Sequence, residues 1–158
     1  MTTIATPETA SGPDTAPPET VAIPASHLDL LTRPICAVLT TIGGDGQPQS
    51  SLVWVDVDAE CARVNTTLER QKGRNLLADP RVSLLVVDPD NTARFIQIRG
   101  VAELVHDGAV QHLDELTREY TRHPGYYGHI YPEAQRERET RVICRIHARR
   151  ITLDAIHA

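Results

Sequence analysis

Apolar and polar residues alternate along several short stretches of the chain, and glycine, proline and aspartate separate these stretches. A period of two is typical of half-buried strands, and the separating residues favour tight turns. In residues 50–58, for example, Val53, Val55 and Val57 share one face, whereas Leu52 lies on the other. Strands are therefore predicted over residues 35–42, 50–58, 61–67, 81–88, 93–105 and 140–156, with Gly100 as a β-bulge.

One long segment has a helical period instead. Apolar residues recur every three positions from Val110 to Leu116 and predict an amphipathic helix over residues 107–123. Shorter helices are predicted over residues 27–32, with Ser26 as N-cap, and from about Arg70 to Pro80. Six strands, mostly in consecutive hairpins and flanked by helices, predict a mainly β protein, a six-stranded antiparallel barrel.

The first 24 residues differ in composition from the rest of the chain. They are rich in Thr, Ala, Pro and Glu, and five prolines lie between positions 7 and 24. Such a segment has too little apolar surface to offset its ordering entropy. We therefore predict a disordered tail over residues 1–24 and one folded domain over residues 25–158, a length that suits a single core.

Charge and cysteine content exclude several classes of protein. The net charge of −5 argues against nucleic acid or an anionic membrane as partner. Three widely spaced cysteines form no C-x-x-C pair, so neither a disulfide framework nor a metal site is expected. No apolar stretch reaches the roughly 20 residues of a membrane span, and no secretory signal is visible. These features predict a cytoplasmic protein whose cysteines are free thiols.

The only lysine of the chain, Lys72, lies between Arg70 and Arg74, where a predicted strand ends and a predicted helix begins. A helix N-terminus offers free N–H groups and the positive end of a dipole. Side chains three positions apart share a helix face, so Lys72 and Asn75 can reach one oxyanion while the arginines flank it. Thr66 lies just before this turn. The pattern predicts a phosphate site, and a solvated basic turn is the alternative.

Three motifs occur in a fixed order, namely G-Q-P-Q-S-S at residues 46–51, R-Q-K-G-R-N-L at 70–76 and D-P-R-V-S at 79–83. In this order and spacing, the chain from about Ser26 to its C-terminus resembles the split β-barrel flavin and deazaflavin proteins. These are relatives of pyridoxamine 5′-phosphate oxidase and include the coenzyme F420-dependent oxidoreductases. The resemblance implies a homodimer of six-stranded split barrels with two cofactor sites at the subunit interface.

The resemblance also implies roles for individual residues. Arg70, Lys72 and Asn75 fall where the family holds the cofactor phosphate. The strand that passes the cofactor ring carries Ser50, Ser51 and Trp54, although Trp54 also suits a core or interface position. Arg141 is expected to reach across from the partner subunit, with Arg136 and Arg138 as alternatives. The tyrosines of residues 126–131 either line a substrate mouth or pack on the barrel.

Two cofactors fit this resemblance. F420 carries a phosphodiester and an oligoglutamate tail, and flavin mononucleotide (FMN) carries one terminal phosphate. Five cations between residues 63 and 81 suit the longer anion, unless they pair with neighbouring carboxylates. The expected function is hydride transfer from reduced F420 to a small organic acceptor. The alternatives are an FMN-dependent oxidase or reductase and a non-catalytic module that binds a cofactor or haem. No catalytic residue is assigned, because the cofactor carries the reactive carbon.

Overall fold

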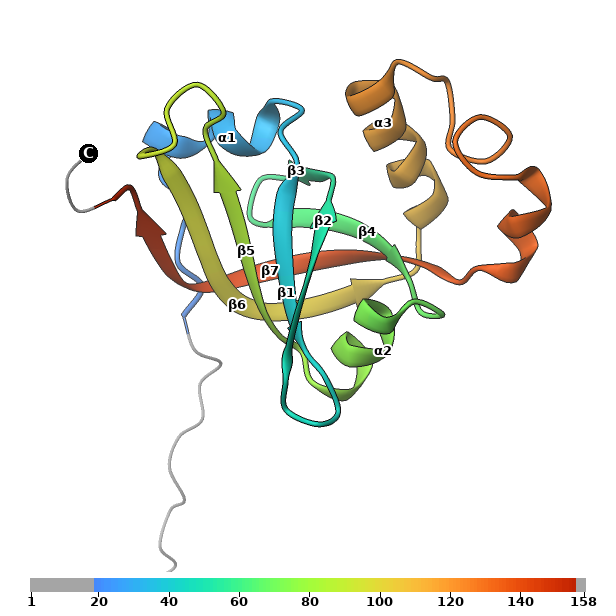
Figure 1. The fold of residues 1–158 in the computed structure, drawn as a ribbon, viewed down its shortest axis with the longest axis horizontal. Helices are drawn as coiled ribbons and strands as arrows, with labels where there is room; N and C mark the ends of the chain where they lie inside the picture. The colour runs from blue at the N-terminus through green and yellow to red at the C-terminus, as the bar shows by residue number, and fades with distance from the viewer. Residues whose placement is uncertain (1–18, 156–158) are drawn as a thin grey trace, which may run out of the picture.

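Figure 1 shows the computed structural model of the chain, which describes residues 19–155. The strands of this part are β1 (Ala37–Ile42), β2 (Pro48–Val53), β3 (Val55–Val57), β4 (Ala62–Thr67), β5 (Arg81–Val87), β6 (Phe95–Val105) and β7 (Arg141–Leu153). The helices are α1 (Asp29–Thr32), α2 (Gln71–Ala78) and α3 (Ala109–Thr121), with two 3₁₀ segments, η1 (Ala25–His27) and η2 (Glu133–Arg138). The mainly β class is therefore confirmed.

All seven strands form one antiparallel sheet in the order β2-β1-β5-β6-β7-β4-β3. β2 and β3 occupy the two opposite edges of this sheet, yet only Trp54 separates them along the chain. The sheet must therefore curl until its edges meet (Figure 1). The result is a split barrel, as predicted, and the structure places the split beside Trp54.

The number of strands differs from the prediction, because the segment predicted as one strand over residues 50–58 forms both β2 and β3. At the break, the Tyr120 hydroxyl accepts a hydrogen bond from the Val55 N–H at 3.1 Å. The same hydroxyl lies 2.9 Å from the Ile35 carbonyl oxygen and 3.0 Å from that of Val55. A side chain of α3 thus forms hydrogen bonds with backbone groups that would otherwise pair with a neighbouring strand.

The interior of the barrel is aliphatic. Leu39, Val64, Leu84 and Ile96 are completely buried in it. The register of β6 against β7 shifts between Arg99 and Gly100, which confirms the predicted bulge. A Cβ atom on Gly100 would lie 2.1 Å from the His147 carbonyl oxygen, so this close approach requires glycine.

The helices lie around the barrel. α3 packs against β4 and β7, and α2 packs against β1 and β4 (Figure 1). The helix predicted over residues 27–32 is divided by Leu28 into η1 and α1. The expected cap is absent, because the Ser26 hydroxyl lies 2.9 Å from His27 Nδ1 and forms no cap bond. Between residues 19 and 155, no helix has the length and apolar character that crossing a membrane requires.

The predicted tail lies mostly outside the described residues, and its division from the folded domain stays a prediction. Its last residues, 19–24, are described. The Val21 N–H donates to the Ala148 carbonyl oxygen at 2.8 Å, and Ile23 packs against the core. Residues 21–24 therefore run along the barrel.

Candidate functional site

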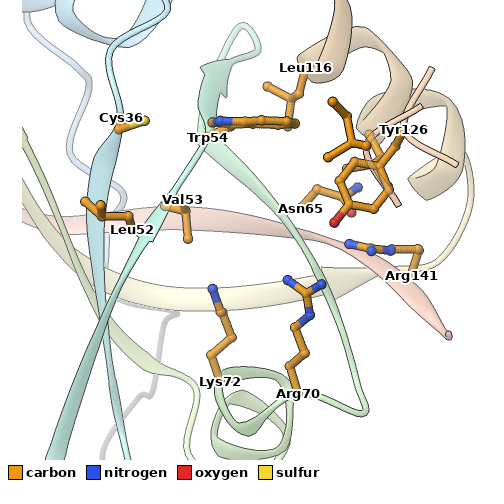
Figure 2. A pocket seen from close by; sticks show the side chains of 12 residues that line it. Cys36, Leu52, Val53, Trp54, Asn65, Arg70, Lys72, Leu116, Tyr126 and Arg141 are labelled. Atoms are coloured by element: carbon orange, nitrogen blue, oxygen red, sulfur yellow. The ribbon is translucent and has the colours of Figure 1, made fainter. Parts of the chain in front are cut away.

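A cavity of about 230 Å³ lies where the barrel is split, between the β2–β3 break, the start of α2 and the loop after α3. Figure 2 shows the arrangement of its side chains. Arg70, Lys72 and Arg141 supply three cationic groups to its wall. Trp54 and Tyr126 supply aromatic rings. The rest of the wall is largely apolar and includes Leu52, Val53, Leu113, Leu116 and Ile130.

The cationic side of the cavity depends on how closely α2 follows β4. Arg70 is the extended residue before the helix, and Lys72 lies in the first helical turn. Gly73 is essential to this packing, since a Cβ atom there would lie 2.2 Å from the Thr67 carbonyl oxygen. The absence of a side chain at residue 73 thus allows the helix start to lie against the end of β4 and places Lys72 at the cavity.

Lys72 is half-buried, and its side chain has no hydrogen bond or ion pair with any residue that the structure describes. Burial lowers the pKa of its ammonium, and the neighbouring charges of Arg70 and Arg141 lower it further. A desolvated cation beside two other cations is costly unless an anion compensates it. This environment is suited to a phosphate or another small anion.

Arg141, the first residue of β7, is held firmly within its own chain. Its guanidinium donates to the Tyr127 hydroxyl at 2.9 Å and to a Glu139 carboxylate oxygen at 2.6 Å. It also lies over the Tyr126 ring, 4.9 Å from the ring centroid. The other Glu139 oxygen is 3.8 Å from Arg70. Glu139 therefore orients both arginines beside Lys72.

Trp54 bounds the cavity on the side away from Lys72 (Figure 2). Its indole stacks on the Tyr120 ring with centroids 5.4 Å apart and an interplanar angle of 20°. The Tyr126 ring makes a T-shaped contact with it, with centroids 6.4 Å apart and an interplanar angle of 83°. Two aromatic neighbours thus fix the indole in the wall. The indole is only partly buried and lines the cavity, so a ligand can contact it.

Residues 23–153 match the sequence profile of the family described as pyridoxamine 5′-phosphate oxidase. This match spans most of the chain, and the curled split barrel agrees with it. The chain belongs to the pyridoxamine 5′-phosphate oxidase family. The resemblance inferred from the three motifs is therefore confirmed.

The chain is also similar to individual known proteins. It is 37% identical to a pyridoxine/pyridoxamine 5′-phosphate oxidase of Cupriavidus metallidurans over 78 residues, 49% of the chain and only 36% of that relative's length. A solved F420 reductase is 33% identical, with 82% of the chain and 98% of the reductase covered and a TM-score of 0.69. A conserved hypothetical protein of Mycobacterium tuberculosis is 32% identical, with 85% and 86% covered and a TM-score of 0.63.

Of the residues that the family resemblance suggested, Arg70, Lys72, Trp54 and Arg141 line the cavity. Arg141 does so beside Arg70 and Lys72 of its own chain, with a side chain that is 4% exposed. Its expected reach from a partner subunit stays a prediction. Arg136, one alternative, instead pairs with Glu133 at 2.6 Å.

Arg74 and Asn75 do not reach the cavity. Arg74 is exposed, and its guanidinium donates to the Glu69 carbonyl oxygen and to Gln71 Oε1. Asn75 is buried, and its amide donates to Thr41 and Gln49, both at 3.0 Å. The structure therefore gives Asn75 the role of joining α2 to the β1–β2 hairpin.

Ser50, Ser51 and Thr66 also lie outside the cavity lining. Ser50 is exposed on the edge strand β2, and its hydroxyl lies 2.8 Å from that of Thr40. Thr66 shares the inner face of β4 with Val64, and its buried hydroxyl has no hydrogen-bond partner in the described chain. Their role in ligand binding stays a prediction.

The cavity lining also includes Asn65 and the α3 residues Leu113 and Leu116, which the sequence did not indicate, and Tyr126, whose position the sequence left open. Asn65 lies on the face of β4 opposite Thr66, toward α3. Strand alternation gives that opposite face, but only the packing of α3 shows that a ligand cavity lies on it. Among residues 19–155, no group of three His, Cys, Asp or Glu side chains could hold a metal.

Proposed function

We propose that the chain binds coenzyme F420 and uses its reduced form to reduce a small organic acceptor by hydride transfer. The observation that carries the proposal is Lys72, a half-buried ammonium beside Arg70 and Arg141 with no anionic partner in the described chain. A cofactor phosphate would compensate this charge. The 33% identity to a solved F420 reductase over 82% of the chain supports the choice of cofactor.

The residues of the cavity suit such a ligand. Arg70, Lys72 and Arg141 would hold its phosphate, and the glycine-dependent start of α2 keeps Lys72 in position. Trp54 and the apolar wall would bound its ring and exclude water from it. When bound, the deazaflavin supplies the hydride. The protein thus contributes anchoring, ring orientation and a dry surface.

An FMN-dependent oxidase or reductase is the second candidate, and one observation favours it. Three of the five cations expected to suit the longer anion are occupied elsewhere. Arg63 pairs with Asp56 at 2.6 Å, Arg81 pairs with Asp79 at 2.6 Å, and Arg74 donates to the Glu69 carbonyl oxygen and to Gln71 Oε1. Of the five, only Arg70 and Lys72 remain, and together with Arg141 they match a single terminal phosphate.

We also propose that two copies of the chain complete the site. Ligand pockets usually have volumes of about 300–1,000 Å³, larger than the 230 Å³ found here. Leu52 lines the cavity from an edge strand, yet it is 72% exposed. A second copy would cover this leucine and extend the wall. Sedimentation equilibrium of the full chain should give a dimer, and a monomer with full cofactor affinity would contradict the proposal.

Equilibrium titration with F420 and FMN side by side tests the choice of cofactor, and oxidation of the reduced cofactor by quinones and nitroaromatics tests turnover. We expect tighter binding of F420 and oxidation of its reduced form by at least one acceptor. Tighter FMN binding would favour the second candidate. Binding without turnover would make the chain a cofactor carrier, and binding of neither molecule would overturn both proposals.

A further inference from the structure

Asn65 of β4 places a side-chain amide in the cavity wall, and hydrogen bonds fix its orientation. Its Nδ2 donates to the Ala109 carbonyl oxygen at 2.7 Å and lies 3.3 Å from His112 Nδ1. Both N–H groups of the amide are therefore used. A flipped amide would place Oδ1 against the Ala109 oxygen, and two acceptors repel each other. Asn65 thus has one favourable orientation.

A second layer of residues supports this orientation. His112 is buried, and its Nε2 lies 3.1 Å from Asp56 Oδ1. Because His112 Nδ1 accepts from Asn65, the proton of the neutral ring is on Nε2 and is donated to Asp56. Asp56 in turn accepts two hydrogen bonds from Arg63, at 2.9 and 2.6 Å. The series of hydrogen bonds from Arg63 through Asp56 and His112 to Asn65 therefore has a defined donor-to-acceptor order.

This network leaves one group without a partner. Asn65 Oδ1 is buried, and no donor among the described residues reaches it. Asn65 and Tyr126 both line the cavity (Figure 2). The Tyr126 hydroxyl forms no hydrogen bond within the described chain. A buried acceptor without a donor costs free energy, and the fixed amide cannot escape that cost by rotating.

The acceptor differs in chemistry from the cationic part of the cavity. A neutral carbonyl oxygen takes an N–H or O–H donor, whereas an ionised phosphate offers acceptors only. The cations at Arg70, Lys72 and Arg141 select the charged part of a ligand. Asn65 therefore requires a hydrogen-bond donor on an uncharged part of the same ligand.

We propose that Asn65 determines specificity for the ring portion of the ligand, with its Oδ1 accepting a hydrogen bond from a neutral N–H or O–H after the side chains that bury it move aside. This inference rests on the proposed function, because the rings of F420 and FMN each carry an imide N–H. An analogue without such a donor leaves Asn65 Oδ1 unpaired and is rejected.

Affinities for phosphorylated and phosphate-free ligands test the proposal, with Asn65→Leu compared against Lys72→Met. The ligand pairs are FMN with riboflavin, and F420 with its deazaflavin fragment lacking the phosphodiester tail. We expect Asn65→Leu to weaken both members of the pair that binds by about tenfold or more. Lys72→Met should weaken only the phosphorylated member. Asn65→Ser, which adds no bulk, repeats the measurement if the leucine variant melts at a much lower temperature.

The outcomes separate the two proposals. Unchanged affinity of folded Asn65→Leu or Asn65→Ser for every ligand would overturn the role of Asn65 and leave the cofactor proposal standing. A loss confined to the phosphorylated ligands would do the same, because it would place Asn65 with the cations. If the unaltered chain bound neither F420 nor FMN, the proposed function and this inference would both fall.

Discussion

Lys72 and Arg74 lie two residues apart in α2, but only Lys72 lines the cavity. Arg74 turns back and donates to Gln71 Oε1 at 2.7 Å and to the Glu69 carbonyl oxygen. With 3.6 residues per turn, side chains two positions apart are rotated by about 200° around the helix axis and so point to nearly opposite sides. The R-x-K-x-R pattern therefore does not form a single cationic patch.

This geometry predicts that two similar substitutions differ strongly in their effect on ligand binding. Lys72→Met should raise the dissociation constant of the preferred cofactor by about tenfold or more, because a hydrogen bond to a charged group contributes about 1.5–3 kcal/mol. Arg74→Met removes the same charge from the same helix and should change the constant by less than about threefold. Calorimetric titration measures both, and equal losses would show that Arg74 also contacts the ligand.

Lys72→Met should have the opposite effect on the ligand-free protein and raise its melting temperature near pH 7. Burial, and then the charges of Arg70 and Arg141, lower the folded-state pKa of Lys72 below its ordinary value. A lysine with a lowered pKa destabilises the fold at every pH where it is still protonated, and this effect fades as pH rises through the folded and then the unfolded pKa.

The measurement is thermal unfolding of wild type, Lys72→Met and Arg74→Met from pH 7 to pH 10. The advantage of Lys72→Met over wild type should be largest near pH 7 and shrink as pH rises. Arg74→Met should show no such gain, because its guanidinium is exposed. A lower melting temperature of Lys72→Met at pH 7 would mean that the ammonium stabilises the free protein and needs no ligand anion.

The strands were predictable because period-two alternation is a local property of the sequence, and the bulge at Gly100 is likewise marked by one residue. The break at Trp54 was not predictable in this way. It depends on the hydroxyl of Tyr120, 65 residues further along than Val55. The alternation of apolar and polar residues in 50–58 continues through the break. The pattern therefore predicts one strand, whereas the fold has two, β2 and β3.

Asn75 shows the same limit at the candidate site. Its spacing from Lys72 places both side chains near one helix face, which favoured a shared oxyanion. In the structure the β1–β2 hairpin approaches α2, and Thr41 and Gln49 accept both hydrogens of the Asn75 amide. Helical spacing gives the direction of a side chain, whereas long-range packing decides which partner it meets.

Gly73→Ala should destabilise the protein by about 1–3 kcal/mol, the usual cost of forcing extra volume into packed structure. The added Cβ would lie 2.2 Å from the Thr67 carbonyl oxygen and 2.9 Å from Leu68 Cα, so the start of α2 must move away from β4. Chemical denaturation measures the change in unfolding free energy, and cofactor titration should show weaker binding as Lys72 is displaced.

Gly44→Ala is the matched control, because no atom lies within 4 Å of a Cβ built at Gly44. This substitution should leave stability and cofactor affinity nearly unchanged. If Gly73→Ala behaved like Gly44→Ala, the contact between the start of α2 and the end of β4 would not position Lys72.

Tyr120→Phe tests what holds the break beside Trp54. Burial raises the pKa of Tyr120 to about 12, so its hydroxyl keeps its proton. The hydroxyl therefore accepts a hydrogen bond from the Val55 N–H and donates one to the Ile35 carbonyl oxygen. Removing the hydroxyl leaves these partly buried groups unpaired and should cost about 1–3 kcal/mol, while the aromatic stack on Trp54 survives. Thermal and chemical unfolding measure the loss.

Tyr131→Phe provides the comparison, because the Tyr131 hydroxyl forms no hydrogen bond within residues 19–155 and its ring is partly exposed. It should unfold like the wild type. Tyr120→Phe should also weaken cofactor binding, since Trp54 joins the two strands that the hydroxyl holds in place. Unaltered stability and affinity of Tyr120→Phe would show that the two edge strands keep their positions without this hydroxyl, through the stacking of the rings alone.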